Sequence, residues 1–381
     1  MPIRTLRLIL HLMLAASISM PLLSGCRNNK SAASCKDPAA AKPLIITVPV
    51  EEDSDDPAIW LHPTAPSQSL ILGTDKGNPG ALYVYDLNGK IIAEKVVKNL
   101  PGPNNVDVEY GLMLNGAAID IAVTALQEGN QLRVFQLPEM RAIDGGGLPV
   151  FAGESKQRAR PMGIALYRRP GDHALFALVS RKSGPTAGYL WQYRLQEGEA
   201  GKVTAIKVRE FGKWSGRGEI EALAVDDTPG FVYYSDEQYG IHKYHADPDA
   251  ANANKELAVF GTTGFKEDRE GISIYQIDGG AGYILVSNQQ AGTFHVYKRE
   301  GEPDDPHRHE LLAELKVCAR DSDGSEVTNV ALNAAFSAGL FVAMSDVRTF
   351  QFYSWADLAG EKLLLAPNGK VGNRALPGLR L

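Results

Sequence analysis

GEIEALAVDDTPGFVYYSDE, residues 218–237, holds two apolar segments, LAV and FVYYS, on either side of the turn sequence DDTPG. Segments of this composition are typical of β-strands, and strands that meet across such a turn pair antiparallel. Glu221 and Glu237 then fall at the same end of the hairpin, on neighbouring strands. Two carboxylates held close together on a rigid backbone repel each other unless a cation lies between them. The stretch therefore predicts a β-hairpin that carries part of an acidic, cation-binding site.

The same unit recurs along the chain. A strand that ends in an aromatic residue appears six times, as LYVY (82–85), LRVF (132–135), LWQY (190–193), IHKY (241–244), FHVY (294–297) and FQFY (350–353). The final aromatics are 50, 58, 51, 53 and 56 residues apart. Before each lies an apolar strand that closes on Ser or Thr, and before that a further β-type segment. Three or more strands repeated six times indicate an all-β fold, a six-bladed β-propeller, over residues 44–381.

Equivalent positions of all blades meet around the central channel of a propeller, although they are distant in sequence. Polar residues at the start of the first strand of each unit are Asp55, Asp56, Asn104, Asn105, Asp107, Glu221, Asp268, Glu270, Asp321, Asp323 and Glu326. Those at the end of the second strand are Asp75, Lys76, Arg181, Lys182, Asp236, Glu237, Asn288, Gln289 and Asp346. The predicted ring is acidic, with a basic side from the first and third units.

Asp and Asn are also ordinary turn residues at strand ends, which explains any single one of these positions. The occurrence of such residues at equivalent positions of the six units needs another explanation, because so many converging carboxylates would destabilise the fold if unpaired. Oxygen ligands without His or Cys select hard cations, and their number favours several Ca²⁺ ions over Mg²⁺. Cations beside Lys76, Arg181 and Lys182 suit a polyanionic small molecule. If that ligand is a phosphate ester, an activated water can attack in line without a covalent enzyme intermediate.

Composition narrows the class of protein. The 381 residues carry a net charge of -6, which argues against nucleic acid as a partner. The sequence has no C-x-x-C pair, no G-x-S-x-G nucleophile elbow and no phosphate-cradling glycine-rich loop.

The N-terminus predicts export. Arg4 and Arg7 precede an apolar run that is too short for a comfortable membrane span and ends in LSGC at 23–26. This ending resembles the lipobox of bacterial lipoproteins, although an ordinary signal peptide with an incidental Cys is the alternative. The resemblance implies a signal peptide at 1–25 and a lipid on Cys26. The composition of the segment that follows predicts a flexible tether at 26–43. We expect the protein to be lipid-anchored to the cell envelope, at the outer membrane or cell surface, with no other membrane contact.

Export also permits disulfides. Cys35 and Cys318 remain once Cys26 is lipidated, and they could pair. Because Cys35 lies in the predicted tether, the sequence favours a free thiol over a disulfide.

Several of these segments together resemble the motifs of the β-propeller phytases. They are DSDDPAIW (53–60), NNVDV (104–108), VSRKSG (179–184), IEALAVDD (220–227), DREGISIY (268–275) and DSDG (321–324), and the match covers roughly residues 50–355. The resemblance implies a calcium-dependent 3-phytase-like phosphomonoesterase that hydrolyses calcium phytate by direct attack of a metal-bound water. It also implies a cleavage subsite and an adjacent subsite that holds a second phosphate. We expect the protein to be a monomer.

Carried over by position, the resemblance implies calcium ligands near the cleavage site at Asp55, Asp56, Glu221, Glu237, Asp268, Glu270 and Gln289. Asp323 and Asp346 are implied to serve stabilising calcium sites, and Lys76 and Lys182 to hold phosphate. The residues expected to act in catalysis are Lys76, Lys182, Glu221 and Glu237, with Arg181 as a further substrate-binding residue.

The sequence departs from the family pattern on the basic side. Glu109 replaces an Arg, Ser183 replaces a carboxylate, and Leu126 and Gln127 stand where a phosphate-binding Arg is expected. Arg181 or Arg160 could supply the missing guanidinium. Two alternatives remain open at this point. One is a non-catalytic propeller that binds anionic ligands or proteins, and the other is a six-bladed calcium lactonase or esterase, which usually needs His near the metal.

Overall fold

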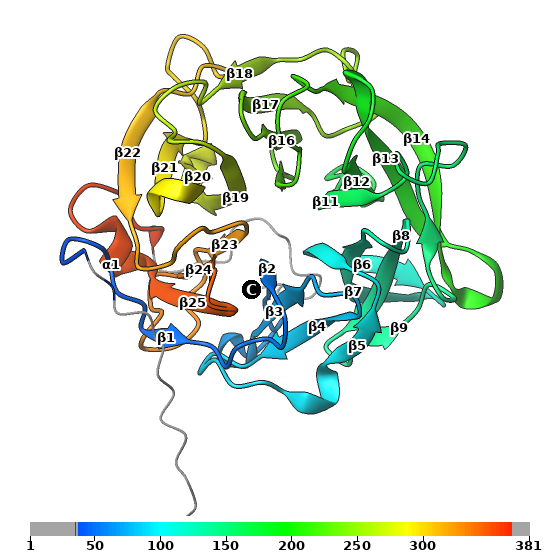
Figure 1. Cartoon of the computed structure of the whole chain (residues 1–381), viewed down its shortest axis with the longest axis horizontal. Coiled ribbons are helices and arrows are strands. Elements are labelled where there is room, and N and C mark those ends of the chain that lie inside the picture. Colours follow the sequence, from blue (N-terminus) through cyan, green and yellow to red (C-terminus); the bar gives the residue numbers. More distant parts are fainter. Residues whose placement is uncertain (1–34, 36, 368–381) are drawn as a thin grey trace, which may run out of the picture. The chain divides into compact units, whose positions relative to one another are not determined.

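The computed structural model describes residues 35 and 37–367, and they form six sheets arranged in a ring (Figure 1). The predicted six-bladed β-propeller is therefore confirmed. In five blades the chain enters along the central channel and moves outward through neighbouring antiparallel strands. The one α-helix in the described residues, α1 (Trp355–Ala359), follows the last strand of the ring. In this part of the chain, no helix has the length and apolar character needed to span a membrane.

The first three blades take up the first half of the chain. Blade one contains β2 (Ser54–Trp60), β3 (Leu70–Asp75), β4 (Gly80–Tyr85) and β5 (Val97–Leu100), with short 3₁₀ turns η1 (Pro66–Gln68) and η2 (Ala93–Lys95). Blade two contains β6 (Pro103–Leu114), β7 (Ala117–Leu126), β8 (Gln131–Leu137), β9 (Arg141–Ala142) and β10 (Leu148–Pro149). Blade three contains β11 (Pro161–Arg168), β12 (Leu175–Arg181), β13 (Ala187–Glu197) and β14 (Val203–Lys213), with η3 (Glu199–Gly201).

The other three blades complete the ring. Blade four contains β15 (Leu223–Asp226), β16 (Phe231–Asp236), β17 (Gly240–His245) and β18 (Ala258–Phe260). Blade five contains β19 (Arg269–Gln276), β20 (Gly282–Asn288), β21 (Thr293–Lys298) and β22 (Leu311–Lys316), with η4 (Asp278–Gly280) and η5 (Gln289–Ala291). Blade six contains β23 (Ser325–Thr328), β24 (Leu340–Ser345) and β25 (Thr349–Ser354), and its outermost strand is β1 (Ile45–Ile46).

The ring is closed by pairing the start of the chain with its end. Ile45 lies opposite Phe352 and Ile46 opposite Gln351 in an antiparallel pair. Closure also depends on packing between blades six and one, where Gly73 lies against Phe350. A Cβ on Gly73 would stand 2.2 Å from the Phe350 ring, so only glycine fits there.

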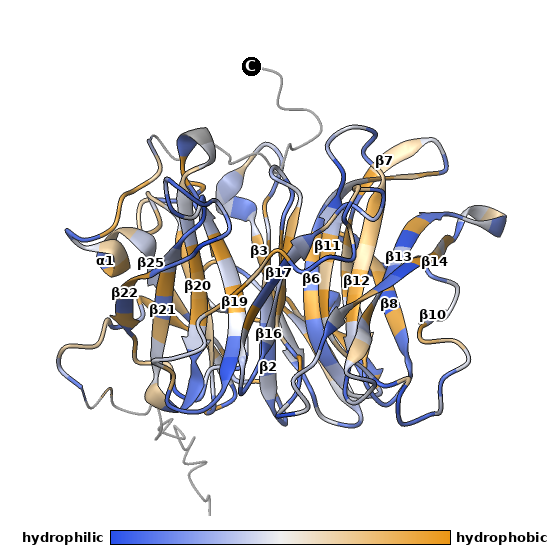
Figure 2. Cartoon of the chain, turned by 90° about the horizontal axis from the view of Figure 1, so that it is seen from above, coloured by the Kyte–Doolittle hydropathy of each residue, from blue (hydrophilic) through white to orange (hydrophobic). Residues whose placement is uncertain are grey.

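The core lies between neighbouring blades. Strands β3, β4, β24 and β25 are buried along their whole length, because each sheet packs against a blade on either side. Figure 2 shows the same division, with hydrophobic residues in the middle of the strands and hydrophilic residues in the loops above and below. The ends of the inner strands are therefore free to carry polar side chains.

Cys35 is joined to Cys318 by a disulfide, so the expectation of a free Cys35 is wrong. The expectation failed because it took the predicted tether to be free of the domain. Ala41 in fact pairs in parallel with Val317, beside the end of β22, and accepts a backbone hydrogen bond from Cys318. These contacts hold the chain beside Cys318 well before β1 begins.

Candidate metal and phosphate site

One backbone hydrogen bond recurs in all six blades and defines the site. The residue that follows the second strand donates its N–H to a carbonyl just before the first strand of the same blade, over 2.8–3.3 Å. The six pairs are Lys76 with Asp53, Gln127 with Gly102, Lys182 with Arg160, Glu237 with Glu219, Gln289 with Asp268 and Asp346 with Arg320. The same bond brings these twelve residues to one face of the ring, around the mouth of the channel.

The residue directly before each of these positions has a different task. Asp75, Arg181, Asp236 and Asn288 are buried, because successive side chains of a strand point to opposite faces. Each binds the loop that leads into its own blade: the Asp236 carboxylate, for example, accepts from Ser215 N and Ser215 Oγ at 2.6 and 2.7 Å. At these four strand ends the last residue of the strand, such as Asp236, therefore holds a loop, and the residue that follows it, such as Glu237, faces the site.

Arg181 accordingly does not join Lys182. Its guanidinium is fully buried and donates to the carbonyl of Tyr189 at 3.0 Å and to Glu154 Oε1 at 3.0 Å. Its centre also lies 4.3 Å from the centroid of the Phe151 ring. A ligand at the mouth of the channel cannot reach a guanidinium that is enclosed in this way, so the structure does not support the prediction that Arg181 binds substrate.

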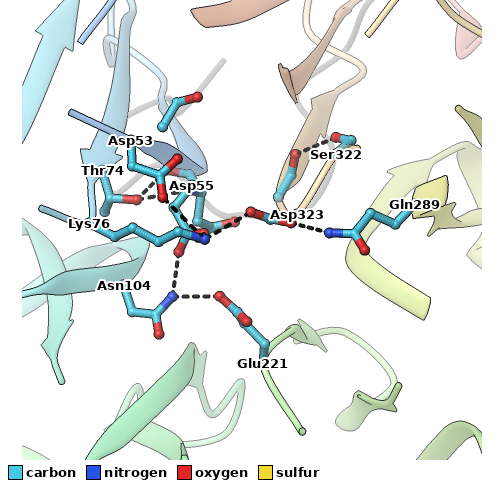
Figure 3. Close-up of polar contacts among 12 residues, drawn as sticks. Asp53, Asp55, Thr74, Lys76, Asn104, Glu221, Gln289, Ser322 and Asp323 are labelled. Atoms are coloured by element: carbon cyan, nitrogen blue, oxygen red, sulfur yellow. Dashed lines mark hydrogen bonds and ion pairs between the residues drawn. The ribbon is translucent and has the colours of Figure 1, made fainter. Parts of the chain in front are cut away.

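At the centre, five side chains from blades one, two, four and six form a connected group (Figure 3). Lys76 Nζ donates to Asp55 Oδ1 at 2.8 Å and to Asp323 Oδ2 at 3.0 Å. Asn104 Nδ2 donates to both Asp55 Oδ2 and Glu221 Oε1. Although burial disfavours its charge, the carboxylates of Asp55, Asp323 and Glu221 raise the pKa of Lys76 above its usual value. Asp323 was implied to belong to a separate stabilising site, but it lies within this central group.

The hairpin at residues 218–237 carries a tight acidic cluster. One carboxylate oxygen from each of Glu219, Glu221 and Glu237 lies within 4.8 Å of the others, close enough to share one cation. Glu221 and Glu237 were predicted to meet in this way, and they do. Glu219 was missed, although its position could have been found. It precedes Glu221 by two residues, as Asp268 precedes Glu270 and Asp53 precedes Asp55.

The buried carboxylates on the acidic side of the channel mouth, those of Glu221, Glu237, Glu270 and Asp323, favour a bound cation. Burial, followed by repulsion from neighbouring carboxylates, raises the pKa of Glu221 and of Glu270 well above the usual value. Burial likewise raises the pKa of Glu237 to about 7 and that of Asp323 to about 7. Glu270 is 5% exposed, and its Oε2 has no hydrogen-bond partner among the described residues. An orphaned carboxylate oxygen among several others fits a bound cation better than a further protein contact.

The remaining predicted ligands lie around this centre. Gln289 Nε2 donates to Asp323 Oδ1, and Gln290 links the carboxylate of Asp268 to Gln289 Oε1. Asp56 lies deeper and lines a central cavity of about 70 Å³, with Val106 N donating to its Oδ2 at 3.0 Å. Asp346 lies apart from the acidic cluster, in an ion pair with Arg320 at 3.0 Å.

Blade three gives the site its basic side, through Lys182 and Arg160, and Gln127 of blade two lies beside them. The sequence predicted a basic contribution from the first unit as well, but Lys76 lies inside the acidic centre, held by Asp55 and Asp323. Lys182 Nζ donates to Glu219 Oε2 at 2.6 Å and remains 35% exposed. Gln127 bridges Asn104 and Arg160, donating to Asn104 Oδ1 at 3.1 Å and accepting from Arg160 Nη2 at 2.7 Å. Arg160 also pairs with Glu128. Of the two guanidiniums considered in place of the missing Arg, only Arg160 lies at the mouth of the channel.

This chain is similar in sequence to known proteins over most of its length. A family model described as Phytase matches residues 4–351. The chain is 31% identical over 327 residues to the 3-phytase of Bacillus subtilis (strain 168), a match that covers 81% of either protein. Among solved structures, the computationally designed Ika8 protein aligns with a TM-score of 0.39 and 10% identity, over 81% of this chain and 70% of that one.

Proposed function

The chain belongs to the phytase family and is a phosphoric monoester hydrolase, and we propose that it hydrolyses phytate in a calcium-dependent reaction. The observation that carries the proposal is the convergence of Glu219, Glu221 and Glu237 within 4.8 Å of one another, beside Lys182. Carboxylates that are destabilised by one another can hold a cation, and an adjacent lysine can hold the phosphate that the cation attracts.

The donor set is the reason for proposing calcium. Apart from Lys76, every charged group of the acidic side is a carboxylate, and the neutral groups are the amides of Asn104 and Gln289. Oxygen donors in this number suit Ca²⁺, which accepts six to eight of them with flexible geometry, better than Mg²⁺. The residues that would hold the ions are Asp55, Glu219, Glu221, Glu237, Asp268, Glu270, Gln289 and Asp323. We propose Asp56 as a further ligand deeper in the channel.

Bound calcium would supply positive charge to the phosphoryl oxygens and make the attacking water more acidic. The chain itself would bind and orient the substrate. Lys76 is fixed by Asp55 and Asp323 at the acidic side, so it would hold the phosphate that is cleaved. Lys182 and Arg160 lie across the channel mouth on blade three, where a second phosphate of the same molecule could bind. Water attacks directly in this scheme, and no protein nucleophile is needed.

The place of the enzyme in the cell is also proposed. Export, lipidation of Cys26 and attachment of a monomer to the outer membrane or cell surface rest on the sequence at 1–43, and Cys26 lies outside the described residues. If Cys26 carries the lipid, a Cys26→Ala chain should move from the membrane fraction to the soluble fraction. Equal membrane attachment of both chains would overturn the proposal.

The function is tested by phosphate release from phytate with calcium and with excess chelator. We expect release that depends on calcium and stops when the chelator is added. Release that persists in chelator would overturn the role of calcium. A protein that calcium stabilises but that releases no phosphate would instead be the non-catalytic anion-binding propeller.

A further inference from the structure

Glu219 takes part in two sets of contacts that compete for the same carboxylate. Its Oε2 accepts a hydrogen bond from Lys182 Nζ at 2.6 Å. Its carboxylate also belongs to the group of three whose oxygens lie within 4.8 Å of one another. One contact neutralises a phosphate-binding lysine, and the other forms part of the cation site.

The backbone of Glu219 is held independently of its side chain. Its N–H donates to Glu237 Oε2 at 2.7 Å, and its carbonyl accepts from Glu237 N at 3.2 Å. The side chain can therefore change partner without a movement of the chain. Lys182 and Glu219 are 35% and 30% exposed in their side chains, so a solvent-borne ion can reach both.

Lys76 is arranged differently. It is held by Asp55, whose side chain is fully buried, and by Asp323, which is 17% exposed. Two carboxylates with little access to solvent hold this lysine, so a cation that draws one of them away leaves the other in place. Of the two lysines, Lys182 alone has a single carboxylate partner at hydrogen-bonding distance among the described residues, and that partner belongs to the acidic cluster.

We propose that Glu219 couples cation binding to phosphate binding. A cation held by Glu219, Glu221 and Glu237 draws the Glu219 carboxylate away from Lys182, and Lys182 then offers its full charge to the second phosphate of the substrate. Without a cation, Glu219 masks Lys182 and weakens anion binding. Such coupling is reciprocal, so phosphate bound at Lys182 must tighten the binding of the cation by the same factor. The inference rests on the proposed function in assigning phosphate to Lys182.

The test is calorimetric titration of the full chain with inorganic phosphate, without any turnover. In excess chelator, Glu219→Gln should bind phosphate about tenfold more tightly than the unchanged protein, because an ion pair that competes with the anion is lost. With saturating calcium the two should differ much less. Glu210→Gln is the matched control, since it removes a carboxylate from a lysine pair on the outer strand of blade three and should leave binding unchanged.

The lysine supplies an independent variant. In a Lys182→Gln chain the further change Glu219→Gln should bring no gain in phosphate binding, and Lys182→Gln alone should tighten calcium binding several-fold. Equal phosphate binding by the Glu219→Gln and unchanged proteins in chelator would overturn the coupling, as would a gain that survives in the Lys182→Gln background. Either result leaves the proposed function standing, because that function fails only if calcium-dependent release from phytate is absent.

Discussion

The acidic side and the basic side of the channel mouth are both built at the ends of the first two strands of their blades, but they differ in how strongly burial and like charges destabilise their side chains. Blades one, four, five and six place Asp55, Glu221, Glu270 and Asp323 around the channel, and most of these carboxylates are destabilised by burial and by one another. On blades two and three, Gln127, Arg160 and Lys182 each have a hydrogen-bond partner. The propeller therefore supplies positions, and the chemistry depends on which blades carry unsatisfied charge.

Neutralising one carboxylate of the acidic side should have the largest effect on activity. Glu221→Gln should lower phosphate release from phytate by about 10²–10³-fold, because it removes a charge from the cation site. In chelator the same variant should melt no earlier than the unchanged protein, since a buried repulsive charge has gone. Release assays and thermal melts of one preparation measure both effects. Full activity of this variant would show that the cation site lies elsewhere.

Substitution of the two neighbouring basic residues of blade three, Arg181 and Lys182, should separate an effect on stability from an effect on activity. Lys182→Ala should lower kcat/KM for phytate about 10–100-fold through loss of a phosphate contact, with little change in Tm. Arg181→Ala should lower the free energy of unfolding by about 3 kcal/mol, because it leaves Glu154 and two carbonyls without their buried partner. Steady-state kinetics and urea unfolding of both variants make the comparison. A purely kinetic effect of Arg181→Ala would contradict the inward position of its guanidinium.

The pH dependence of stability should expose the charge repulsion of the acidic side. The pKa of Glu237 rises from 4.5 to about 7, and that of Asp323 from 3.8 to about 7. The folded state then binds more protons than the unfolded state between these values, so stability in chelator should fall as pH rises from about 4 to about 7. Calcium should offset that fall, because it replaces the protons. Melting curves across this range, with calcium and with chelator, measure it, and a chelated protein that gains stability toward pH 7 would contradict the assignment.

The disulfide should matter least. Replacing both Cys35 and Cys318 with Ser should lower the free energy of unfolding by less than the usual 2–4 kcal/mol, because β1 and Ala41 already fix the same segment. Phosphate release should not change, since neither sulfur lies within the central group of Lys76 and its partners. Melts under reducing and oxidising conditions provide the measurement. A large loss of activity would show that this segment also positions the site.

The features that could be predicted from the sequence are those set by interactions between residues close together in the chain. The repeat of the strands identified six blades, because hydrophobic alternation and turn residues act within a few positions. The same repeat located the pairs at the strand ends and the meeting of Glu221 with Glu237. Glu219 also followed this pattern, two residues before Glu221, but was not recognised.

The strand repeat, the polar residues at the strand ends and the motifs were enough to predict the propeller, the acidic character of its channel mouth and the resemblance to the phytases. The folded arrangement of the blades was needed to see that Arg181 is enclosed while Lys182 is partly exposed. It was also needed to see that Asp323 lies in the central group and that Cys35 reaches Cys318. These outcomes depend on how whole blades pack, because packing fixes which face of a strand end is covered and which distant segments touch. The alternation of side chains along a strand can be read from the local sequence. Which of the two faces is buried depends on the neighbouring blade.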